Sequence, residues 1–403
     1  MAKWRVIMDM ESLHLDQRGN HGLPQPLDAS TTEELRHKLQ AYYIDLKIRS
    51  LGRIAIVGAA GEGKRLSELC RKHAIDVVAL ADDHPSKIGT MIHGDTVAPV
   101  SALVSLDRSV PIVIASHRVL GAAERLRAMG FRTVLPFAAL QVMAPDLFPP
   151  HMFYDGLLDD LTNNRDQYRW LHDVLADNRS RDVLAAVLAY RQTLDAAMLK
   201  SVLDDDDLYA PKGLMRFSDD EVYVDGGSYD GDTIGTFIER VGGRFKNIYA
   251  FEPDPVTFKK LEANFASEAR VQLFNAGLHS QKGTLRFRDD ASRGAIFATD
   301  GEIEMPVTTI DDAIGDRPVT YIKMNIEGAE VDALYGGRRA IQRSLPRLAI
   351  SVYHRASDLW QIPQLVLELV PDYRLYLRQH DGGIIETVLY ALPPAASASR
   401  SGR

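Results

Sequence analysis

The sequence is short of cysteine, of long apolar stretches and of positive charge, and each shortage excludes something. Cys70 is the only cysteine among the 403 residues, so no disulfide can form within the chain and no cysteine-based metal site is available. The formal net charge of −8 leaves no electrostatic footprint for nucleic acid or for an anionic membrane surface. These shortages favour a protein of a reducing compartment that does not act on nucleic acid.

No run of apolar residues is long enough to cross a bilayer, and charged residues interrupt the N-terminal stretch. We therefore expect neither a membrane span nor a signal peptide. Hydrophobic residues make up 45% of the chain and charged residues 25%, which is typical of globular proteins. The length favours two domains over one. We expect a cytoplasmic protein, and the sequence leaves open whether it forms homo-oligomers.

The most informative stretch begins with a short apolar run of β-forming residues, Val222–Val224. Residues 225–231 follow with three glycines and two aspartates, which suit a loop. Apolar residues then recur at helical spacing from Ile234, and Asp232 or Thr233 is expected to cap the helix. The order strand, glycine loop, helix is the opening of a nucleotide-binding βαβ unit.

A second predicted strand ends at Glu252, where a carboxylate can accept hydrogen bonds from both ribose hydroxyls of a nucleoside. The glycine loop carries acidic residues but no Lys or Arg, which argues against a phosphate ligand. A cationic, phosphate-free nucleoside suits such a loop, and S-adenosylmethionine (SAM) is one. The alternatives are that Asp225 and Asp232 only cap the helix and that Glu252 is a surface acid before a proline.

The predicted cofactor-binding residues come from the glycine loop, from the end of the second strand and from the turn after the third strand, which could face an adenine or simply reverse the chain. They are Asp225, Gly226, Gly227, Ser228, Gly231, Asp232, Thr233, Glu252, Pro253, Asn275 and Ala276.

Four motifs stand in the C-terminal half. They are Val-Asp-Gly-Gly-Ser-Tyr-Asp-Gly-Asp-Thr (224–233), Phe-Glu-Pro-Asp-Pro (251–255), Ile-Lys-Met-Asn-Ile-Glu-Gly-Ala-Glu (322–330) and Val-Tyr-His-Arg-Ala-Ser-Asp-Leu-Trp (352–360). In this order they resemble the FkbM family of SAM-dependent methyltransferases. The resemblance implies a methyltransferase that uses SAM as its cofactor.

Methyl transfer to a hydroxyl requires alignment of the acceptor and removal of its proton. His354 is the best candidate base by residue type, with Glu327 and Asp230 in reserve, and the alternative for His354 is a structural hydrogen bond. Asn325 stands where the family commonly has Asp. An asparagine can neither act as a base nor give a metal a charged ligand, so we predict no metal. We list His354, Glu327 and Asn325 as catalytic candidates.

The fold class predicted is α/β, with a seven-stranded Rossmann-like sheet of the SAM methyltransferase type, a smaller N-terminal Rossmann-like domain and a helical connector. The strand ends of the larger sheet are expected to converge on one crevice. Lys323, inside a strand, is expected to pair with Glu327 or Glu330. The predicted domains are an arm and helix (1–50), the small α/β module (51–150), the connector (151–215), the methyltransferase domain (216–392) and a disordered tail (393–403).

The N-terminal module has the glycine pattern G-x-x-G-x-G from Gly58 to Gly63 instead of the dinucleotide fingerprint. It is similar to nucleotide-sugar-binding modules of sugar-modifying enzymes, and a purely structural role is an equal alternative.

The function predicted is O-methylation of a small-molecule acceptor, the hydroxyl of a sugar, nucleotide sugar or related natural product. One alternative is a non-catalytic SAM-fold binding or scaffold protein, which Asn325 supports. The other is an NAD-dependent sugar oxidoreductase built on the N-terminal module, against which the missing G-x-G-x-x-G counts.

Overall fold

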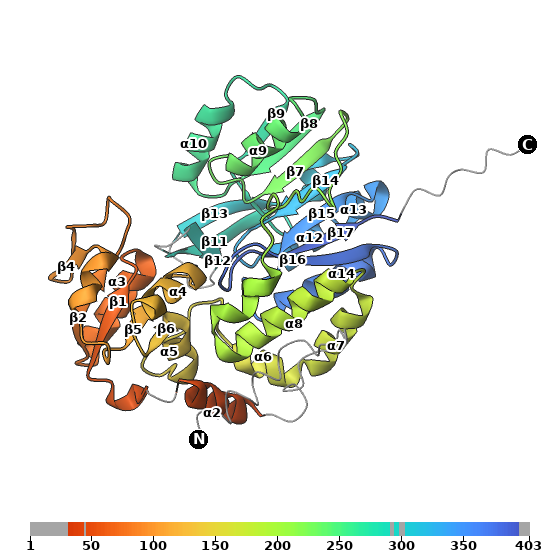
Figure 1. Cartoon of the computed structure of the whole chain (residues 1–403). Coiled ribbons are helices and arrows are strands. Elements are labelled where there is room, and N and C mark those ends of the chain that lie inside the picture. The colour runs from red at the N-terminus through yellow and green to blue at the C-terminus, as the bar shows by residue number, and fades with distance from the viewer. Residues whose placement is uncertain (1–30, 44–45, 291–293, 298–302, 395–403) are drawn as a thin grey trace, which may run out of the picture. The chain divides into compact units, whose positions relative to one another are not determined.

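The computed structural model of the chain describes residues 31–43, 46–290, 294–297 and 303–394 (Figure 1). The predicted N-terminal arm up to residue 30 and most of the predicted tail lie outside these residues. The described chain divides into two compact units. The first comprises the chain up to Asp173, Asn178–Asp204 and Gln379–Glu386, and the second comprises Val174–Asp177, Asp205–Arg378 and the chain from Thr387.

The first unit is built on a six-stranded sheet with the strand order β3-β4-β2-β1-β5-β6. Its strands are β1 (Arg53–Val57), β2 (Asp76–Ala81), β3 (Met91–Ile92), β4 (Asp95–Ala98), β5 (Ile112–Ile114) and β6 (Val134–Pro136). The central strand β1 pairs in parallel with β2 and β5, and four of its five residues are buried. Buried on both faces, such a strand reads as a continuous apolar run.

The described helices of the first unit include most of the block predicted as a helical connector. They are α2 (Thr32–Tyr42), η2 (Ile48–Ser50), α3 (Gly61–Lys72), η3 (Val100–Ser105), α4 (Leu120–Ala128), α5 (Phe137–Met143), α6 (Leu157–Asn163), α7 (Arg165–Val174), α8 (Asn178–Thr193) and η4 (Ala196–Val202).

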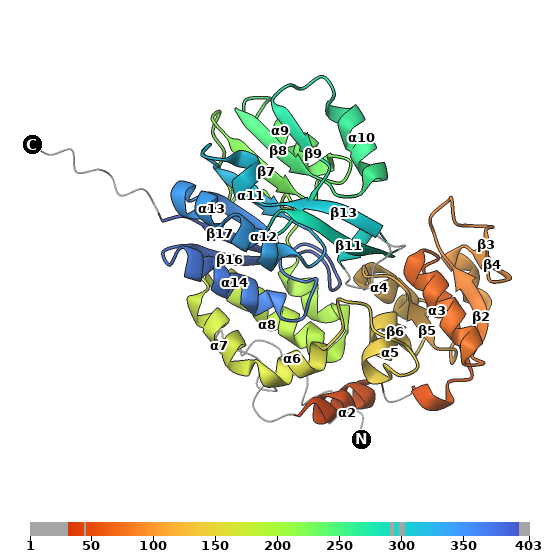
Figure 2. The same ribbon diagram turned by 180° about the vertical axis from the view of Figure 1, so that it is seen from behind.

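The second unit contains a seven-stranded sheet with the order β16-β17-β15-β14-β7-β8-β9. Its strands are β7 (Val222–Gly226), β8 (Asn247–Phe251), β9 (Val271–Phe274), β14 (Tyr321–Met324), β15 (Arg347–Ser351), β16 (Arg374–Gln379) and β17 (Thr387–Leu392). The strands from β15 to β9 run parallel, and β17 is antiparallel to β15. Figures 1 and 2, seen from opposite sides, show helices against both faces of this sheet. The mixed α/β class predicted for the chain is confirmed.

Among the described residues, the other elements of the second unit are six helices and a smaller sheet of the order β10-β13-β11-β12. They are α9 (Asp232–Arg240), α10 (Pro255–Phe265), α11 (Ile310–Ile314), α12 (Glu330–Gly336), α13 (Arg338–Ser344), α14 (Asp358–Leu369), β10 (Gly277–Leu278), β11 (Gly283–Asp290), β12 (Gly294–Phe297) and β13 (Ile303–Thr308).

Aromatic side chains form the core between the large sheet and α9. Tyr223 of β7 and Tyr321 of β14 stack with ring centroids 4.7 Å apart, and Phe237 of α9 lies 4.8 Å from the Tyr223 ring. All three are buried. Aromatic pairs at such separations add to the stabilisation from apolar burial, so they anchor the helix that follows the glycine loop against the strand that precedes it.

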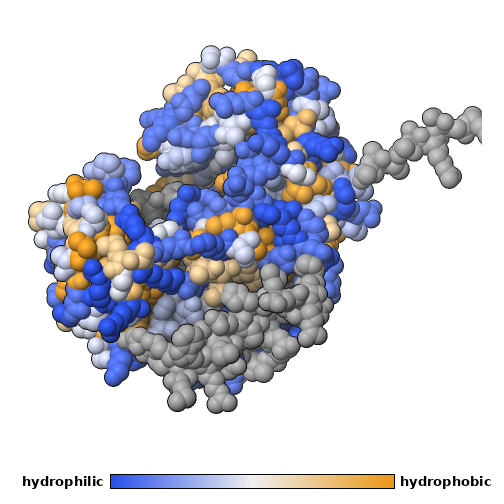
Figure 3. Space-filling view, viewed as in Figure 1, coloured by the Kyte–Doolittle hydropathy of each residue, from blue (hydrophilic) through white to orange (hydrophobic). Residues whose placement is uncertain are grey.

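None of the described helices is both long and apolar enough to cross a membrane. On the face drawn in Figure 3, hydrophobic residues form small separate groups among hydrophilic ones.

Candidate active site

The carboxyl ends of five neighbouring parallel strands meet at one edge of the large sheet. Pairing sets Gly226 beside Phe251 and beside Met324, so the residues that follow these strands emerge side by side. The predicted site residues that leave this edge, one after each of β7, β8, β9, β14 and β15, are Gly227, Glu252, Asn275, Asn325 and His354. The strand order reverses between β14 and β7, and ligands of open α/β sheets bind at such a switch.

The glycine loop folds back onto the end of β8. The backbone N–H groups of Gly227 and Ser228 donate to the carbonyl oxygen of Phe251 at 3.1 and 3.0 Å. The buried Ser228 hydroxyl donates to the carbonyl oxygen of Asp225 at 2.9 Å and accepts from the Phe251 N–H at 3.1 Å. The loop conformation is therefore fixed by the strand beside it.

Two loop positions admit only glycine. Gly227 has φ +75°, and a Cβ there would lie 1.9 Å from the carbonyl oxygen of Asn325. Gly231 has φ +95°, and its Cβ would lie 2.1 Å from the Phe265 ring. Both φ values are in the left-handed region that favours glycine.

The helix after the loop begins differently from the prediction. Its N-cap is Gly231, without a side-chain cap, so the predicted cap by Asp232 or Thr233 is wrong. The Thr233 hydroxyl instead donates to Asp225 Oδ2 at 2.7 Å.

Lys323 binds the glycine loop from the neighbouring strand. Its Nζ lies 2.9 Å from Asp225 Oδ1 and donates to the carbonyl oxygens of Gly226 at 3.2 Å and Gly227 at 2.8 Å. Both charged side chains are buried. The predicted pairing of Lys323 with Glu327 or Glu330 is therefore wrong, because strand pairing sets Lys323 directly beside Asp225.

Glu252 is buried at the end of β8, and each of its carboxylate oxygens accepts a hydrogen bond from a backbone N–H group. Oε2 accepts from the Tyr229 N–H at 3.0 Å and Oε1 from the Asp254 N–H at 2.9 Å. Burial raises the pKa of Glu252 to about 7. The Asn275 amide donates to the carbonyl oxygens of Glu252 at 2.9 Å and Pro253 at 3.1 Å, which links the end of β9 to the end of β8.

The remaining predicted cofactor-binding residues flank this edge. Asp232 is exposed at the start of α9, and Thr233, Pro253 and Ala276 are half-buried.

The turn between β14 and α12 carries Asn325 and Glu327. The Tyr353 hydroxyl donates to Asn325 Oδ1 at 3.3 Å. Glu327 and Gly328 adopt φ of +53° and +90°, which is costly for a residue with a Cβ, and the Glu327 side chain is 27% exposed. Backbone held in this region is found disproportionately at functional sites.

His354 lies behind Glu327 and is buried with two further acids. Its Nε2 faces Glu327 Oε2 at 3.7 Å, and its Nδ1 lies 3.0 Å from Glu330 Oε1. Asp358, the first residue of α14, completes the cluster, in which ligand-type atoms of Glu330, His354 and Asp358 lie within 4.8 Å of one another. We call these three residues the buried triad.

Burial and the charges of its neighbours shift the pKa of each group in the buried triad from its ordinary value. Burial alone would lower the pKa of His354, but the carboxylates of Glu330 and Glu327 raise it to about 9. Burial raises the pKa of Asp358 to about 7. Against the effect of burial, His354 holds the pKa of Glu330 below its usual value. His354 is therefore protonated at neutral pH unless something else supplies the positive charge.

Glu330 and Asp358 were missed as site residues from the sequence. Glu330 follows Glu327 by three residues and Asp358 follows His354 by four, which is a spacing of one helical turn in each motif. This spacing is the signal in the sequence that could have identified them. It does not show that the two motifs pack against each other.

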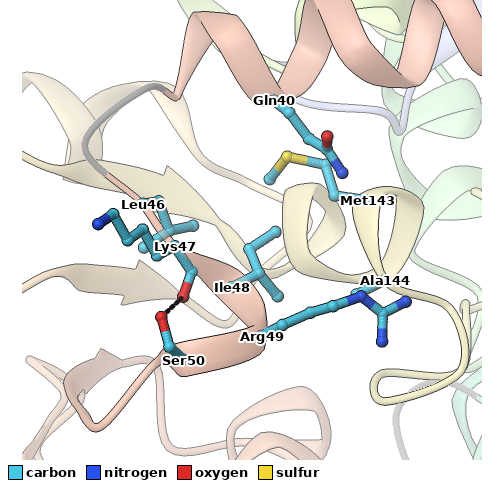
Figure 4. A pocket seen from close by; sticks show the side chains of 8 residues that line it. All are labelled: Gln40, Leu46, Lys47, Ile48, Arg49, Ser50, Met143 and Ala144. Atoms are coloured by element: carbon cyan, nitrogen blue, oxygen red, sulfur yellow. Dashed lines mark hydrogen bonds between the residues drawn. The ribbon is translucent and has the colours of Figure 1, made fainter.

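A cavity of about 360 Å³ lies in the first unit (Figure 4). Its lining residues are Gln40, Leu46, Lys47, Ile48, Arg49, Ser50, Met143 and Ala144. Among the described residues that line it, no side chain is a carboxylate or an imidazole.

Comparisons with known proteins agree with this geometry. Residues 225–382 match the family model described as the methyltransferase FkbM domain. The crystal structure of methyltransferase FkbM from Methylobacillus flagellatus KT is similar at 26% sequence identity and a TM-score of 0.69, over 96% of this chain and 98% of that chain. Among curated proteins, none matches the chain in sequence.

A more distant likeness is to fibrillarin from Aeropyrum pernix, solved in complex with natively bound S-adenosyl-L-methionine. It covers 45% of this chain and 71% of that chain at 12% identity and a TM-score of 0.31, which is too low to support a conclusion about this protein.

Proposed function

We propose that the protein transfers the methyl group of SAM to a hydroxyl of a small molecule, because residues 225–382 match the methyltransferase FkbM domain model and residues 224–360 carry the four motifs. The acceptor class that we propose is a sugar, a nucleotide sugar or a related natural product. One observation carries the proposal. The glycine loop, Glu252 and Asn325 follow adjacent parallel strands at the point where the strand order reverses.

The cofactor site proposed uses Glu252 and the backbone of the glycine loop. Each Glu252 oxygen accepts one backbone N–H and keeps a second acceptor direction for a ribose hydroxyl. Lys323 already neutralises Asp225, so Asp225 acts by shaping the loop. The attraction for a cationic ligand comes from Glu252, with Asp230 and Asp232 at the mouth of the loop.

SAM would supply the electrophilic methyl carbon, and the chain must then remove the proton of the acceptor hydroxyl. We propose that Glu327 accepts this proton, because it is a partly exposed carboxylate in the turn that follows β14 at this edge. His354 is buried, so we propose that it acts through Glu327, which its Nε2 faces at 3.7 Å. Asn325, tied to Tyr353, would align the acceptor.

The single buried cysteine, Cys70, suits a reducing compartment, and a cytoplasmic location stays part of the proposal.

The proposal is tested by two measurements on the purified protein. Isothermal titration with SAM and with S-adenosylhomocysteine should show binding of both. Incubation with labelled SAM and a cell extract, followed by mass spectrometry, should identify a methylated sugar-like product. The proposal would be refuted if the protein bound neither SAM nor S-adenosylhomocysteine.

The assignment of Glu327 is tested separately. Glu327→Gln should lower kcat by on the order of 10²–10⁴-fold without weakening SAM binding. Glu368→Gln, which removes an exposed acid from α14, is the matched control and should leave kcat unchanged. Equal rates for Glu327→Gln and the wild type would exclude Glu327 as the base.

A second candidate function is a non-catalytic protein that binds SAM. It is favoured by Asn325, since an amide stands where the family commonly has a carboxylate. This alternative expects nucleoside binding with no product from any acceptor.

A further inference from the structure

The buried triad gathers two carboxylates and an imidazole from separate elements. Glu330 begins α12, His354 follows β15, and Asp358 begins α14. All three side chains are at most 2% exposed. Their ligand-type atoms lie within 4.8 Å of one another, a separation that three ligands of one ion can have after small adjustments.

One carboxylate oxygen of the triad lacks a partner. Glu330 Oε1 accepts from the Ile326 N–H at 2.8 Å and faces His354. For Glu330 Oε2, no hydrogen-bond donor lies within reach among the residues that the structure describes. A bare carboxylate oxygen in the protein interior is costly, because burial removes its water and nothing replaces it. This oxygen therefore points to a ligand that carries positive charge.

We propose that Glu330, His354 and Asp358 form a binding site for a divalent first-row transition metal ion, of the class of Mn²⁺ or Zn²⁺. Carboxylate oxygens suit Mn²⁺, and an imidazole nitrogen suits Zn²⁺ and its neighbours. Two carboxylates, a neutral imidazole and a divalent ion sum to zero charge. With both carboxylates ionised, the triad with a protonated His354 instead keeps one excess negative charge in the interior.

The surroundings of His354 match those of a metal-binding histidine. Such a histidine commonly donates its second ring N–H to a carboxylate, which fixes its orientation. With Nδ1 toward Glu330, the second nitrogen of His354 faces Glu327 at 3.7 Å. The metal would thus hold the ring that positions Glu327.

The ion proposed is structural. Its three ligands are buried, so an acceptor molecule cannot reach it directly. It would tie together the starts of α12 and α14 and the end of β15, and the helices α12 and α14 also pack against each other. The proposal does not depend on the reaction, because metal binding can be measured without SAM or an acceptor.

The test is metal binding by the full chain. The protein is stripped with a chelator, dialysed and titrated with MnCl₂ and, separately, with ZnCl₂, and its metal content is measured by mass spectrometry. One equivalent should bind. Asp358→Asn and Glu330→Gln should each weaken binding by at least the roughly 10–100-fold that loss of an outer-shell partner costs, while Glu368→Gln should bind like the wild type.

A second measurement guards against variants that fail to fold. Electron paramagnetic resonance of Mn²⁺ bound to the wild type should show coupling to an imidazole nitrogen, and loss of this coupling in His354→Gln identifies His354 as the ligand. Stoichiometric binding that Asp358→Asn does not weaken, or no binding by the wild type, would overturn the proposal and leave the triad as an ion pair around a protonated histidine. A Mn²⁺ spectrum without nitrogen coupling would overturn it as well.

Discussion

Lys323 and Asp225 form a buried ion pair between two adjacent strands of the large sheet, with Nζ 2.9 Å from Oδ1. The same ammonium group donates to the carbonyl oxygens of Gly226 and Gly227. The Lys323 ammonium group thus neutralises the buried Asp225 carboxylate and fixes the loop backbone that would face a nucleoside.

Lys323→Met should lower the free energy of unfolding by about 3–5 kcal/mol, because it leaves the Asp225 carboxylate buried and uncompensated. Urea denaturation measures this change. The double variant Lys323→Met, Asp225→Asn removes both charges and should regain much of the loss. If the double variant is as unstable as the single one, the ion pair is not what stabilises the loop.

Gly227→Ala should abolish tight binding of SAM, because the added methyl group would collide with the Asn325 carbonyl and force the loop to move. The left-handed backbone adds about 1–2 kcal/mol of destabilisation. Gly235→Ala in the middle of α9 is the control, since its Cβ meets nothing within 4 Å. It should leave binding unchanged and raise stability by about 0.5–1 kcal/mol. Titration calorimetry and thermal melts report both outcomes.

Binding of S-adenosylhomocysteine should depend on the charge of Glu252, whose pKa burial raises to about 7. Only the carboxylate accepts two ribose hydroxyls, so the association constant should rise roughly tenfold per pH unit below 7 and level off above it. Calorimetry on both sides of this pH measures the slope. Glu252→Gln should bind more weakly and show no such slope.

The stability of the free protein should respond in the opposite direction. A carboxyl group whose folded pKa is raised favours the folded state when it is protonated. The contribution of Glu252 is therefore fully present below the ordinary carboxyl pKa and is lost as the pH rises through about 7. Glu252→Gln should remove this part of the pH dependence in urea denaturation. An unchanged profile would mean that Glu252 is already ionised in the folded protein.

The activity of Asn325→Asp should distinguish between the two candidate functions, a methyltransferase and a non-catalytic scaffold protein that binds SAM. A carboxylate can still accept the Tyr353 hydroxyl, so the fold should be kept. If the wild type is an enzyme, Asn325→Asp should turn over at a rate of the same order, and Asn325→Ala should be slower. If the wild type is a scaffold, it should be inactive and only Asn325→Asp should gain activity. Product formation from labelled SAM decides between them.

Much of the fold followed from local patterns. The apolar run before residue 225 predicted β7. The pair Asp254-Pro255 is a typical helix start, and Asp254 caps α10 by accepting from the Thr257 N–H at 2.7 Å. The strand ends could be assigned to one edge because parallel strands share a direction. These features depend on neighbours in sequence.

The features that were missed depend on neighbours in space. Lys323 was assigned to acids a few residues away, but strand register sets it beside Asp225, about a hundred residues earlier in the chain. His354 is a candidate base by its residue type, with a structural hydrogen bond as the alternative, and the sequence does not show that its side chain is buried. A single sequence carries no record of register or helix packing, so charge partners across elements could not be assigned.

Residues Gln379–Glu386, from the last residue of β16 to the residue before β17, belong to the first unit, although both strands are part of the sheet of the second unit. Within the first unit, the Gly382 carbonyl accepts from the N–H groups of Val119 and Leu120, and Arg118 pairs with Glu386 at 2.7 Å. A fragment ending near residue 204 would therefore lack a piece of its own interior. Each unit consists of several separate segments of the chain, so cutting the chain at one point cannot give two complete units. Expression of either unit alone would require several of its segments to be joined.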